Sequence, residues 1–432
     1  MNIWARRTYF LFSVLAFAVI ATGLVFYASG WRYDFSTRTV GLVGALSVDS
    51  EPSNANVYID GSLLKDKTPL SANDLVADQY RLSIWKEGYY DWQQNIEINK
   101  SSTTFIDKVY LIRQQSLDQY YINASISYQA VSNNGRFMAM QSVDGEFLVY
   151  DLSEAQILDQ QELSGSVDKI TWNQNDTSLL IKTGDVFYLY NLSEKTFIDL
   201  NQEFGLNATK YFWVADQANY IIAAEQNKYY KINKFQQTIQ TMDLPGVPVY
   251  SAKDIYFCQT EESGVLYAYD LEKDLLSETN IAGTGQPSEL TFERMIDGFL
   301  PIINRGDNQG YFYDFENQRF SAMDQPLESI DFISPDNLLY VNNHEIWQID
   351  NQKDEKNLIL RTAENIDSAY WLINNQYVIY ITDSNQIKIN EINRPENNIY
   401  TIDHDLINEL VRGQNDNTFY LINDQGIYKL DF

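Results

Sequence analysis

The residues that most often carry catalytic chemistry are scarce in this chain. Its 432 residues include two histidines, His344 and His404, and one cysteine, Cys258. The histidines lie in separate polar, turn-like stretches, so neither a multi-histidine metal site nor a Ser-His-Asp arrangement finds support. Cys258 ends the apolar run Ile255–Cys258, which favours a small buried residue over a reactive thiol. We therefore predict no catalytic, cofactor-binding or metal-binding residues.

Carboxylates are the remaining candidates for acid–base chemistry, as in glycosidases. With 59 Asp and Glu residues the sequence singles out no catalytic pair. Turns such as Asp307–Gly310 and Asn423–Gly426 hold oxygen ligands but fewer than a calcium loop supplies, so we expect simple Asx turns there. No nucleophile elbow, Cys-x-x-Cys, His-Glu-x-x-His or phosphate-binding loop occurs.

The net charge of −28 and the pI of about 4.3 limit the class of partner. Nucleic-acid binding needs clustered Lys and Arg to neutralise phosphates, so it is not expected. A single cysteine permits no intrachain disulfide. For a large exported protein this favours a bacterial source over a eukaryotic secretory route.

An uncharged apolar stretch follows the amino terminus. Between Arg7 and Arg32 there is no charged side chain, and aromatic residues stand at both ends, which is typical of a membrane span with interfacial rings. We predict a cytoplasmic segment at 1–7, a transmembrane anchor at 8–31 and the bulk of the chain outside the cell membrane. The alternative is a cleaved signal peptide with the small residues Ala21–Gly23 at the cleavage site.

Residues 44–99, after a linker at 32–43, have the alternation of a compact β domain. Val57 and Ile59 form one period-two pair and Leu82 and Ile84 another, while Asp60-Gly61 is a tight-turn signal.

This region resembles the PEGA domain family in three blocks, namely Gly44–Gly61, Thr68-Pro69-Leu70 and Tyr80–Trp92. In the naming tetrapeptide Pro52-Ser-Asn-Ala55, Pro and Ala match, while Asn54 replaces the family glycine; Asp78 replaces a second glycine. Asn and Asp tolerate left-handed backbone best among non-glycine residues. The resemblance implies a non-catalytic spacer or interaction module of bacterial and archaeal envelope proteins.

From residue 107 onward a unit of about 40 residues repeats, which is typical of β-propeller blades. Each unit has an aromatic residue before a polar turn, an apolar second strand, and a third strand that ends in an aromatic–polar–aliphatic mark. The repetition favours core packing for these aromatic residues. The ends resemble degenerate WD repeats without the Trp-Asp dipeptide. The marks are Tyr150-Asp-Leu, Tyr190-Asn-Leu, Tyr230-Lys-Ile, Tyr269-Asp-Leu, Tyr313-Asp-Phe, Trp347-Gln-Ile, Asn390-Glu-Ile and Tyr428-Lys-Leu.

The last unit, 406–432, has only three strands, so another segment must supply the fourth. We predict that Asp107–Arg113 supplies it and closes an eight-bladed ring across 107–432. A seven-bladed ring is the alternative. The overall prediction is an all-β chain with one transmembrane helix, a PEGA-like domain and a β-propeller.

These elements predict a membrane-anchored binding or scaffold protein whose propeller face engages a protein or a cell-envelope glycan. A surface hydrolase that acts on glycan or peptide through carboxylates of the central tunnel is the alternative. Turns between second and third strands emerge on one face of a propeller, and nearly every such turn here carries an acid. The candidate binding face therefore comprises Asp144, Asp185, Glu225, Glu261, Glu262, Asp307, Asp383 and Asp424.

Overall fold

The computed structural model divides the chain into two compact units, one of residues 1–114 with 393–400 and one of 115–392 with 401–432. The structure describes residues 3–34, 39–114, 118–121, 126–260, 265–271, 273, 275–278, 290–293, 295, 298–306, 309–334, 337–350, 355–373, 375–392, 398–403, 409–423 and 426–432.

The chain begins with the apolar helix α1 (Ile3–Ala28). The most apolar stretch within its segment Arg6–Ala28 has a mean hydropathy of 2.3, and none of that stretch is buried against protein. By length and composition α1 is the one helix among the described residues able to span a membrane. Two residues separate the end of α1 from the first strand, so part of the expected linker at 32–43 forms strands instead.

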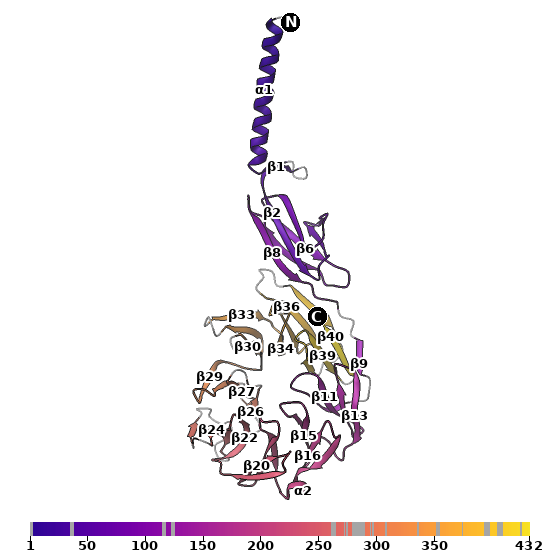
Figure 1. The fold of residues 1–432 in the computed structure, drawn as a ribbon, viewed down its shortest axis with the longest axis vertical. Helices are drawn as coiled ribbons and strands as arrows, with labels where there is room; N and C mark the ends of the chain where they lie inside the picture. The colour runs from indigo at the N-terminus through magenta and orange to yellow at the C-terminus, as the bar shows by residue number, and fades with distance from the viewer. Residues whose placement is uncertain are drawn as a thin grey trace. The chain divides into compact units, whose positions relative to one another are not determined.

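The small domain contains two four-stranded sheets (Figure 1). In the first, β2 pairs antiparallel with β1 and β5 and parallel with β8; the second has the order β4-β3-β6-β7. The strands are β1 (Trp31–Asp34), β2 (Thr39–Glu51), β3 (Asn56–Ile59), β4 (Ser62–Leu63), β5 (Leu70–Val76), β6 (Gln79–Trp85), β7 (Trp92–Glu97) and β8 (Thr103–Tyr110).

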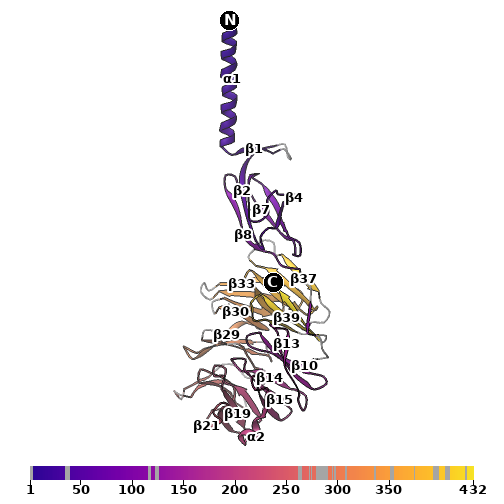
Figure 2. The same ribbon diagram turned by 45° about the vertical axis from the view of Figure 1, so that its right-hand side comes forward.

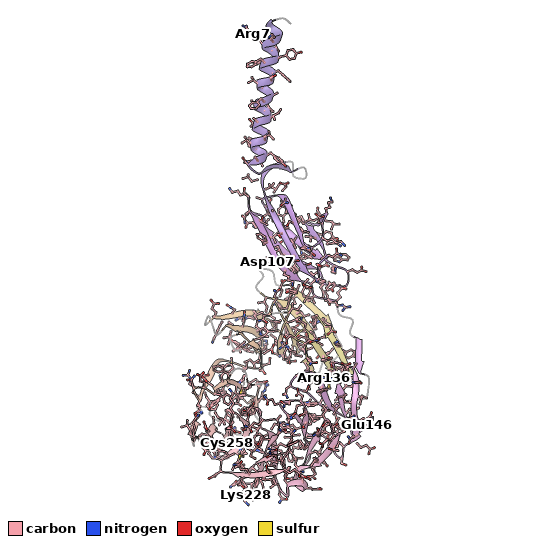
Figure 3. The ribbon with its side chains drawn as sticks, viewed as in Figure 1. Arg7, Asp107, Arg136, Glu146, Lys228 and Cys258 are labelled. Atoms are coloured by element: carbon pink, nitrogen blue, oxygen red, sulfur yellow. The ribbon has the colours of Figure 1, made fainter. Side chains whose placement is uncertain are left out.

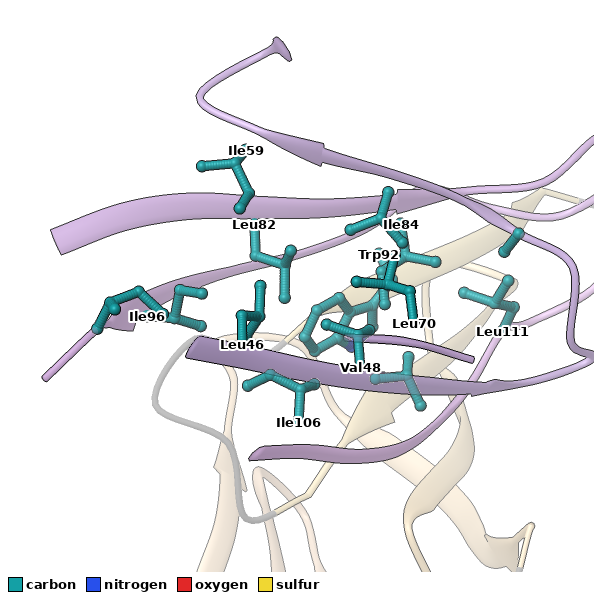
Figure 4. Packing of buried hydrophobic residues seen from close by; sticks show 14 residues of the cluster. Leu46, Val48, Ile59, Leu70, Leu82, Ile84, Trp92, Ile96, Ile106 and Leu111 are labelled. Carbon is teal, nitrogen blue, oxygen red and sulfur yellow. The ribbon is translucent and has the colours of Figure 1, made fainter. Parts of the chain in front are cut away.

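The two sheets enclose one hydrophobic core (Figure 4). Trp92 lies at its centre with no exposed surface, and Leu46, Leu82 and Ile84 are equally buried. Leu82 and Ile84 form one of the period-two pairs predicted from the sequence, and they are buried because one face of each strand must leave water.

The two residues that replace family glycines, Asn54 and Asp78, have different backbone conformations. Asn54 has a φ of 66°, so it takes the left-handed conformation that the family glycine would adopt. Asp60 and Gly61 also have positive φ, as the predicted tight turn requires. Asp78 is not among the residues with positive φ; Asp74, with a φ of 63°, is. The left-handed backbone expected at Asp78 therefore occurs at Asp74, four residues earlier.

The second unit contains eight four-stranded sheets within its described residues, which confirms the propeller and favours eight blades over seven (Figures 1 and 2). Blade one consists of β10 (Ile126–Val131), β11 (Phe137–Ser142), β12 (Glu146–Asp151) and β13 (Gln156–Glu162), and blade two of β14 (Lys169–Trp172), β15 (Ser178–Thr183), β16 (Val186–Asn191) and β17 (Thr196–Asp199). Blade three consists of β18 (Lys210–Trp213), β19 (Tyr220–Glu225), β20 (Lys228–Asn233) and β21 (Thr238–Met242), and blade four of β22 (Val247–Ala252), β23 (Ile255–Gln259), β24 (Leu266–Asp270) and β25 (Leu275–Glu278).

Blade five consists of β26 (Leu290–Phe292), β27 (Phe299–Asn304), β28 (Gln309–Asp314) and β29 (Arg319–Pro326), and blade six of β30 (Ser329–Ser334), β31 (Asn337–Asn342), β32 (Glu345–Asp350) and β33 (Glu355–Arg361). Blade seven consists of β34 (Ile366–Leu372), β35 (Tyr377–Thr382), β36 (Gln386–Glu391) and β37 (Ile399–Asp403). Blade eight has β38 (Glu409–Arg412), β39 (Thr418–Asn423) and β40 (Gly426–Asp431). A short helix, α2 (Leu200–Phe204), links blades two and three.

First strands of neighbouring blades contact one another, as β10 does with β14 and β30 with β34, so the first strands lie innermost. The repeated mark now has a physical explanation. In blades one, two, four, five and six its aromatic residue faces an apolar residue on the fourth strand, as Tyr190 faces Phe197 with ring centroids 5.0 Å apart. In blades three and eight the partners are polar, since Tyr230 faces Thr241 and Tyr428 faces Gln119. Such cross-strand pairs stabilise a sheet. In blades three, six and eight the mark lies two residues earlier in the strand, which keeps it on the same face because strands have a period of two.

The polar residue that ends the third strand organises the next turn. Asp151 Oδ1 accepts hydrogen bonds from the backbone N–H of Ser153 and Glu154, and Asn233 Oδ1 accepts from those of Phe235 and Gln236. These are Asx turns, in which the side chain replaces a backbone acceptor. Where this polar residue belongs to the mark, as Asp151 does, the mark combines a packing residue with a turn residue.

The segment that completes blade eight is not the predicted one. Asp107–Arg113 lies largely in β8, which pairs with β2 in the small domain. The fourth strand of blade eight is β9 (Asp118–Tyr121), which pairs antiparallel with β40. The need for a donor was correctly predicted, but apolar alternation alone did not distinguish the last strand of one domain from the first strand of the next.

Cysteines at Asp118 and Lys429 (D118C/K429C) should form a disulfide under mild oxidation, because these residues face each other across β9 and β40. The bond would join the ends of the ring and raise the free energy of unfolding by roughly 2–4 kcal/mol. Gel mobility without reductant and thermal melting measure both effects. D107C/K429C is the matched control; if it cross-links and D118C/K429C does not, β9 is not the closing strand.

Candidate interaction surfaces of the propeller

The propeller has two faces with different hydrogen-bonding patterns. We call the face that carries the turns between second and third strands, together with the links between blades, the link face. The opposite face carries the turns between first and second strands and is called the lock face, because successive turns bond to one another there. On the lock face Asp176 accepts hydrogen bonds from the backbone N–H groups of Asn133 and Asn134 at 2.8 and 3.1 Å.

The lock-face pattern recurs between other blades. Asp216 Oδ2 accepts from the backbone N–H of Lys253 at 2.8 Å, and Asn417 Oδ1 accepts from that of Ile373 at 3.0 Å. Indole groups add further bonds between inner strands, since Trp172 Nε1 donates to the carbonyl of Ala130 at 2.9 Å. On the lock face these polar groups are hydrogen-bonded between blades. The link face is therefore the better candidate for partner binding.

The structure describes only four of the eight acids of the candidate binding face. Asp144, Asp185 and Asp383 are exposed in turns of the link face, and Glu225 is half-buried at the end of β19. Glu261, Glu262, Asp307 and Asp424 lie outside the described residues.

Two of the acids already hold links between blades. Glu225 accepts from the backbone N–H of Asn207 and from Tyr230 Oη, both at 3.1 Å. Asp383 Oδ2 accepts from Asn365 Nδ2 at 2.9 Å. Asp144 and Asp185 are thus the described members whose exposure suits an external partner.

The excess negative charge belongs entirely to the propeller part of the sequence. Residues 1–114 hold 11 Lys and Arg and 11 Asp and Glu, so their net charge is zero. Residues 115–432 hold 20 basic and 48 acidic residues, which accounts for the full −28. The propeller alone would therefore attract cationic partners.

Two carboxyl groups on inner strands have a raised pKa. The surrounding protein desolvates Glu293, next to β26, and raises its pKa, an effect that Arg305 partly offsets. Desolvation likewise raises the pKa of Glu409, which accepts a hydrogen bond from Gln129 Nε2 at 3.0 Å. The two belong to blades five and eight, and each has its own neighbour, so they do not form one catalytic pair.

A serine and a lysine meet between blades two and three. Lys234 Nζ lies 2.7 Å from Ser178 Oγ and 5.0 Å from the ring centroid of Trp213. Burial lowers the pKa of Lys234 to about 8. The pairing has the form of a lysine base beside a serine nucleophile, but Ser178 is only 1% exposed, so no substrate reaches its hydroxyl. We assign the pair to blade packing.

The remaining chemical candidates have structural surroundings. Cys258 is fully buried, and burial raises the pKa of its thiol to about 12 (Figure 3). His344 is exposed, with Nδ1 at 3.1 Å from the carbonyl of Glu364, and His404 lies outside the described residues. The Asx turn at Asn423 is present, since its Oδ1 accepts from the backbone N–H of Gly426. Within the described part of the chain no three His, Cys, Asp or Glu residues are grouped to hold a metal.

A bidentate ion pair between blades was not predicted from the sequence. Arg412 on β38 donates to both carboxylate oxygens of Asp331 on β30, at 3.0 and 2.6 Å, and to the carbonyl of Trp371 at 2.8 Å. Asp331 also accepts from the backbone N–H of Trp371 at 2.8 Å. The pair thus spans blade seven and joins three blades. Its only signal in the sequence is an arginine after two apolar residues, Leu410 and Val411.

Comparisons with known proteins agree with this architecture. Residues 43–111 match the PEGA domain family, and the propeller has the WD40-like fold. The C-terminal WD40 domain of Sif2 superposes with a TM-score of 0.51 at 11% identity, covering 73% of this chain and 98% of that domain. The WD40 domain of SCAP from fission yeast and Saccharomyces cerevisiae Sqt1 give TM-scores of 0.47 and 0.48 at 9% and 8% identity, each covering 73% of this chain and 98% of the other. No curated protein sequence matches the chain.

Changing Arg412 to Met should lower the free energy of unfolding of the propeller by about 3 kcal/mol, because it leaves the partly buried carboxylate of Asp331 without its cation. Arg361→Met is the control: Arg361 bonds Glu345, but its side chain is 68% exposed, so the loss should stay below ~1 kcal/mol. Urea denaturation followed by tryptophan fluorescence measures both. Equal losses would mean that the Arg412 pair does not join the blades.

Proposed function

We propose that this protein is a single-pass membrane protein that holds a binding propeller outside the cell membrane. α1 would be the anchor, the PEGA domain the spacer, and the link face of the propeller the surface that engages a protein or a cell-envelope glycan. The observation that carries the proposal is an apolar helix with no buried surface at the amino end of a chain whose other described elements are nearly all strands.

The orientation rests on charge and on the PEGA domain. Arg6 and Arg7 precede the apolar segment, which favours a cytoplasmic amino terminus. A PEGA domain directly after the helix fits an extracytoplasmic location, because the family occurs in envelope and surface proteins.

The acidic link face supports a cationic partner as the finer proposal. Asp144 and Asp185 project into solvent from a propeller with a large net negative charge. Charges of one sign on a surface raise the local concentration of the opposite sign and speed association at low salt. A basic segment of an envelope protein has the matching chemistry.

The alternative, a hydrolase that uses tunnel carboxylates, needs two carboxyl groups at one site. Glu293 and Glu409 have the raised pKa that a general acid needs, but they stand in separate blades. Within the described part of the chain, Glu293 and Glu328 each lie 4.0 Å from the guanidinium of Arg305, which fits an ion-pair cluster, so binding is the better-supported function.

Protease added to right-side-out membrane vesicles that contain the full chain should digest the propeller, while inverted vesicles should protect it. The reason is the proposed orientation of α1, with its two arginines on the cytoplasmic side. Immunoblotting against a carboxyl-terminal tag follows the digestion. A soluble product that begins near Leu24, or protection in both vesicle types, would contradict the anchored topology.

Changing Asp144, Asp185, Asp307 and Asp424 to Asn should weaken the binding of an octalysine probe several-fold at low salt, because it removes the exposed charges of Asp144 and Asp185 and two further acids that the sequence predicts in equivalent turns, while retaining turn chemistry. The matched variant neutralises four acids that are exposed in turns of the lock face, namely Glu154, Glu194, Glu316 and Asp416. Titration at two salt concentrations compares them with the parent. Equal weakening by the two variants would mean that the probe senses total charge and that the link face is no binding site.

A further inference from the structure

The second sheet of the PEGA domain has a face that lies away from the core. In β3, β6 and β7 every other side chain is buried, as Leu82 and Ile84 are, so the residues between them point outward. Trp85 belongs to this outer face and is 41% exposed. Indole side chains are large and are mostly covered in folded domains, so an exposed one on a flat sheet marks a candidate binding surface.

The strand register brings a second aromatic ring beside Trp85. Trp85 lies opposite Asn56 in the pairing of β6 with β3. Tyr58 is two residues further along β3 and points outward as well. The two aromatic residues are therefore diagonal neighbours about 7–8 Å apart, near enough for both rings to contact one ligand. Leu63 lies opposite Tyr58 and is 59% exposed, so it extends this apolar strip onto β4.

Side-chain amides lie next to the apolar strip. Gln93 and Asn95 point outward from β7, and the register places Asn95 opposite Arg81. Arg81 also donates to Gln93 Oε1, which restrains that amide. A side-chain amide offers both donors and an acceptor. We call this surface the aromatic–amide face, and its outward residues on β3, β6 and β7 are Asn56, Tyr58, Gln79, Arg81, Ser83, Trp85, Gln93, Asn95 and Glu97.

The charge and the size of the aromatic–amide face limit what binds there. Among its outward residues Arg81 and Glu97 are the one cation and the one anion, so the face attracts neither a basic segment nor a polyanion. Strands lie about 4.8 Å apart and rise ~3.4 Å per residue, so three strands of up to seven residues cover roughly 350 Å². A stable protein interface covers about 800 Å² on each partner. The face is therefore suited to a short uncharged chain.

A glycan of N-acetylated sugars has the matching chemistry. The C–H groups on one side of a sugar ring carry partial positive charge, and the face of an aromatic ring is negative, so the two pack together. An acetamido group has one donor and one acceptor, which a side-chain amide can pair at the same time. Sugar hydroxyls offer further bonds of both kinds.

We propose that the aromatic–amide face binds an uncharged, β-linked chain of N-acetylhexosamines, the chemistry of an envelope glycan backbone. Trp85 and Tyr58 stack on the sugar rings. Hydrogen bonds to acetamido and hydroxyl groups come from Asn56, Gln93 and Asn95. The PEGA domain is then a binding module in its own right, in addition to the propeller, and this inference depends neither on the membrane anchor nor on the link face.

Isothermal titration of the full chain with chitohexaose, in a detergent without sugar groups, tests the proposal. The parent should bind with a saturable isotherm, and Trp85→Ala should weaken binding by roughly tenfold because stacking is lost. Trp85→Phe, which keeps a ring, should retain most of the affinity. Phe105→Ala is the matched control, since Phe105 is 66% exposed on β8 of the other sheet and should not matter. Cellohexaose, which lacks acetamido groups, should bind several-fold more weakly than chitohexaose.

Three results would overturn the proposal. The first is a parent that shows no saturable binding of chitohexaose, or equal losses in W85A and F105A. The second is equal affinity for cellohexaose, which would exclude recognition of acetamido groups. The third is a parent that sediments as a dimer while W85A is a monomer and neither binds sugar, which would make the face a contact between two copies. Unchanged thermal melting of W85A verifies that the substitution leaves the fold intact.

Discussion

A ring of blades is stable only if its last blade is completed, and this constraint governs the rest of the structure. Blade eight has three strands at the end of the chain, β38 to β40, and receives its fourth, β9, from the start of the propeller. An incomplete blade would leave β40 as an open edge that could pair with other chains. Closure is reinforced by contacts between blades eight and one, since Tyr420 Oη donates to the carbonyl of Leu152 at 2.9 Å and Gln129 bonds Glu409.

Much of this architecture could be predicted from the sequence because it depends on local periodicity. The apolar helix, the alternation of Leu82 with Ile84 and the recurrent marks each arise from residues close in the chain. The closing strand could not be assigned in this way, because β9, Asp-Gln-Tyr-Tyr, shows no alternation of apolar and polar residues that would identify it as a strand. Register and partner are decided by the turns and by distant strands.

The candidate binding face was only partly predictable for a similar reason. Acidic residues in turns signal exposure, which Asp144, Asp185 and Asp383 have. Whether a carboxylate faces a partner or holds the fold depends on residues distant in sequence or on another strand, as with Asn207 and Tyr230 beside Glu225. Likewise, Arg412 finds Asp331 two blades away in the chain, a pairing that no spacing rule predicts. The separation of a neutral amino-terminal part, residues 1–114, from an acidic propeller, by contrast, is readable from the sequence.

The position of β9 in the chain has a mechanical consequence. The chain passes from the small domain into β9 and only afterwards into blade one. In the proposed arrangement, tension between the anchored amino terminus and a bound partner would act first on the hydrogen bonds between β9 and β40. The load that the ring can bear would then be limited by the four-residue strand Asp118–Tyr121 and its pairing with β40.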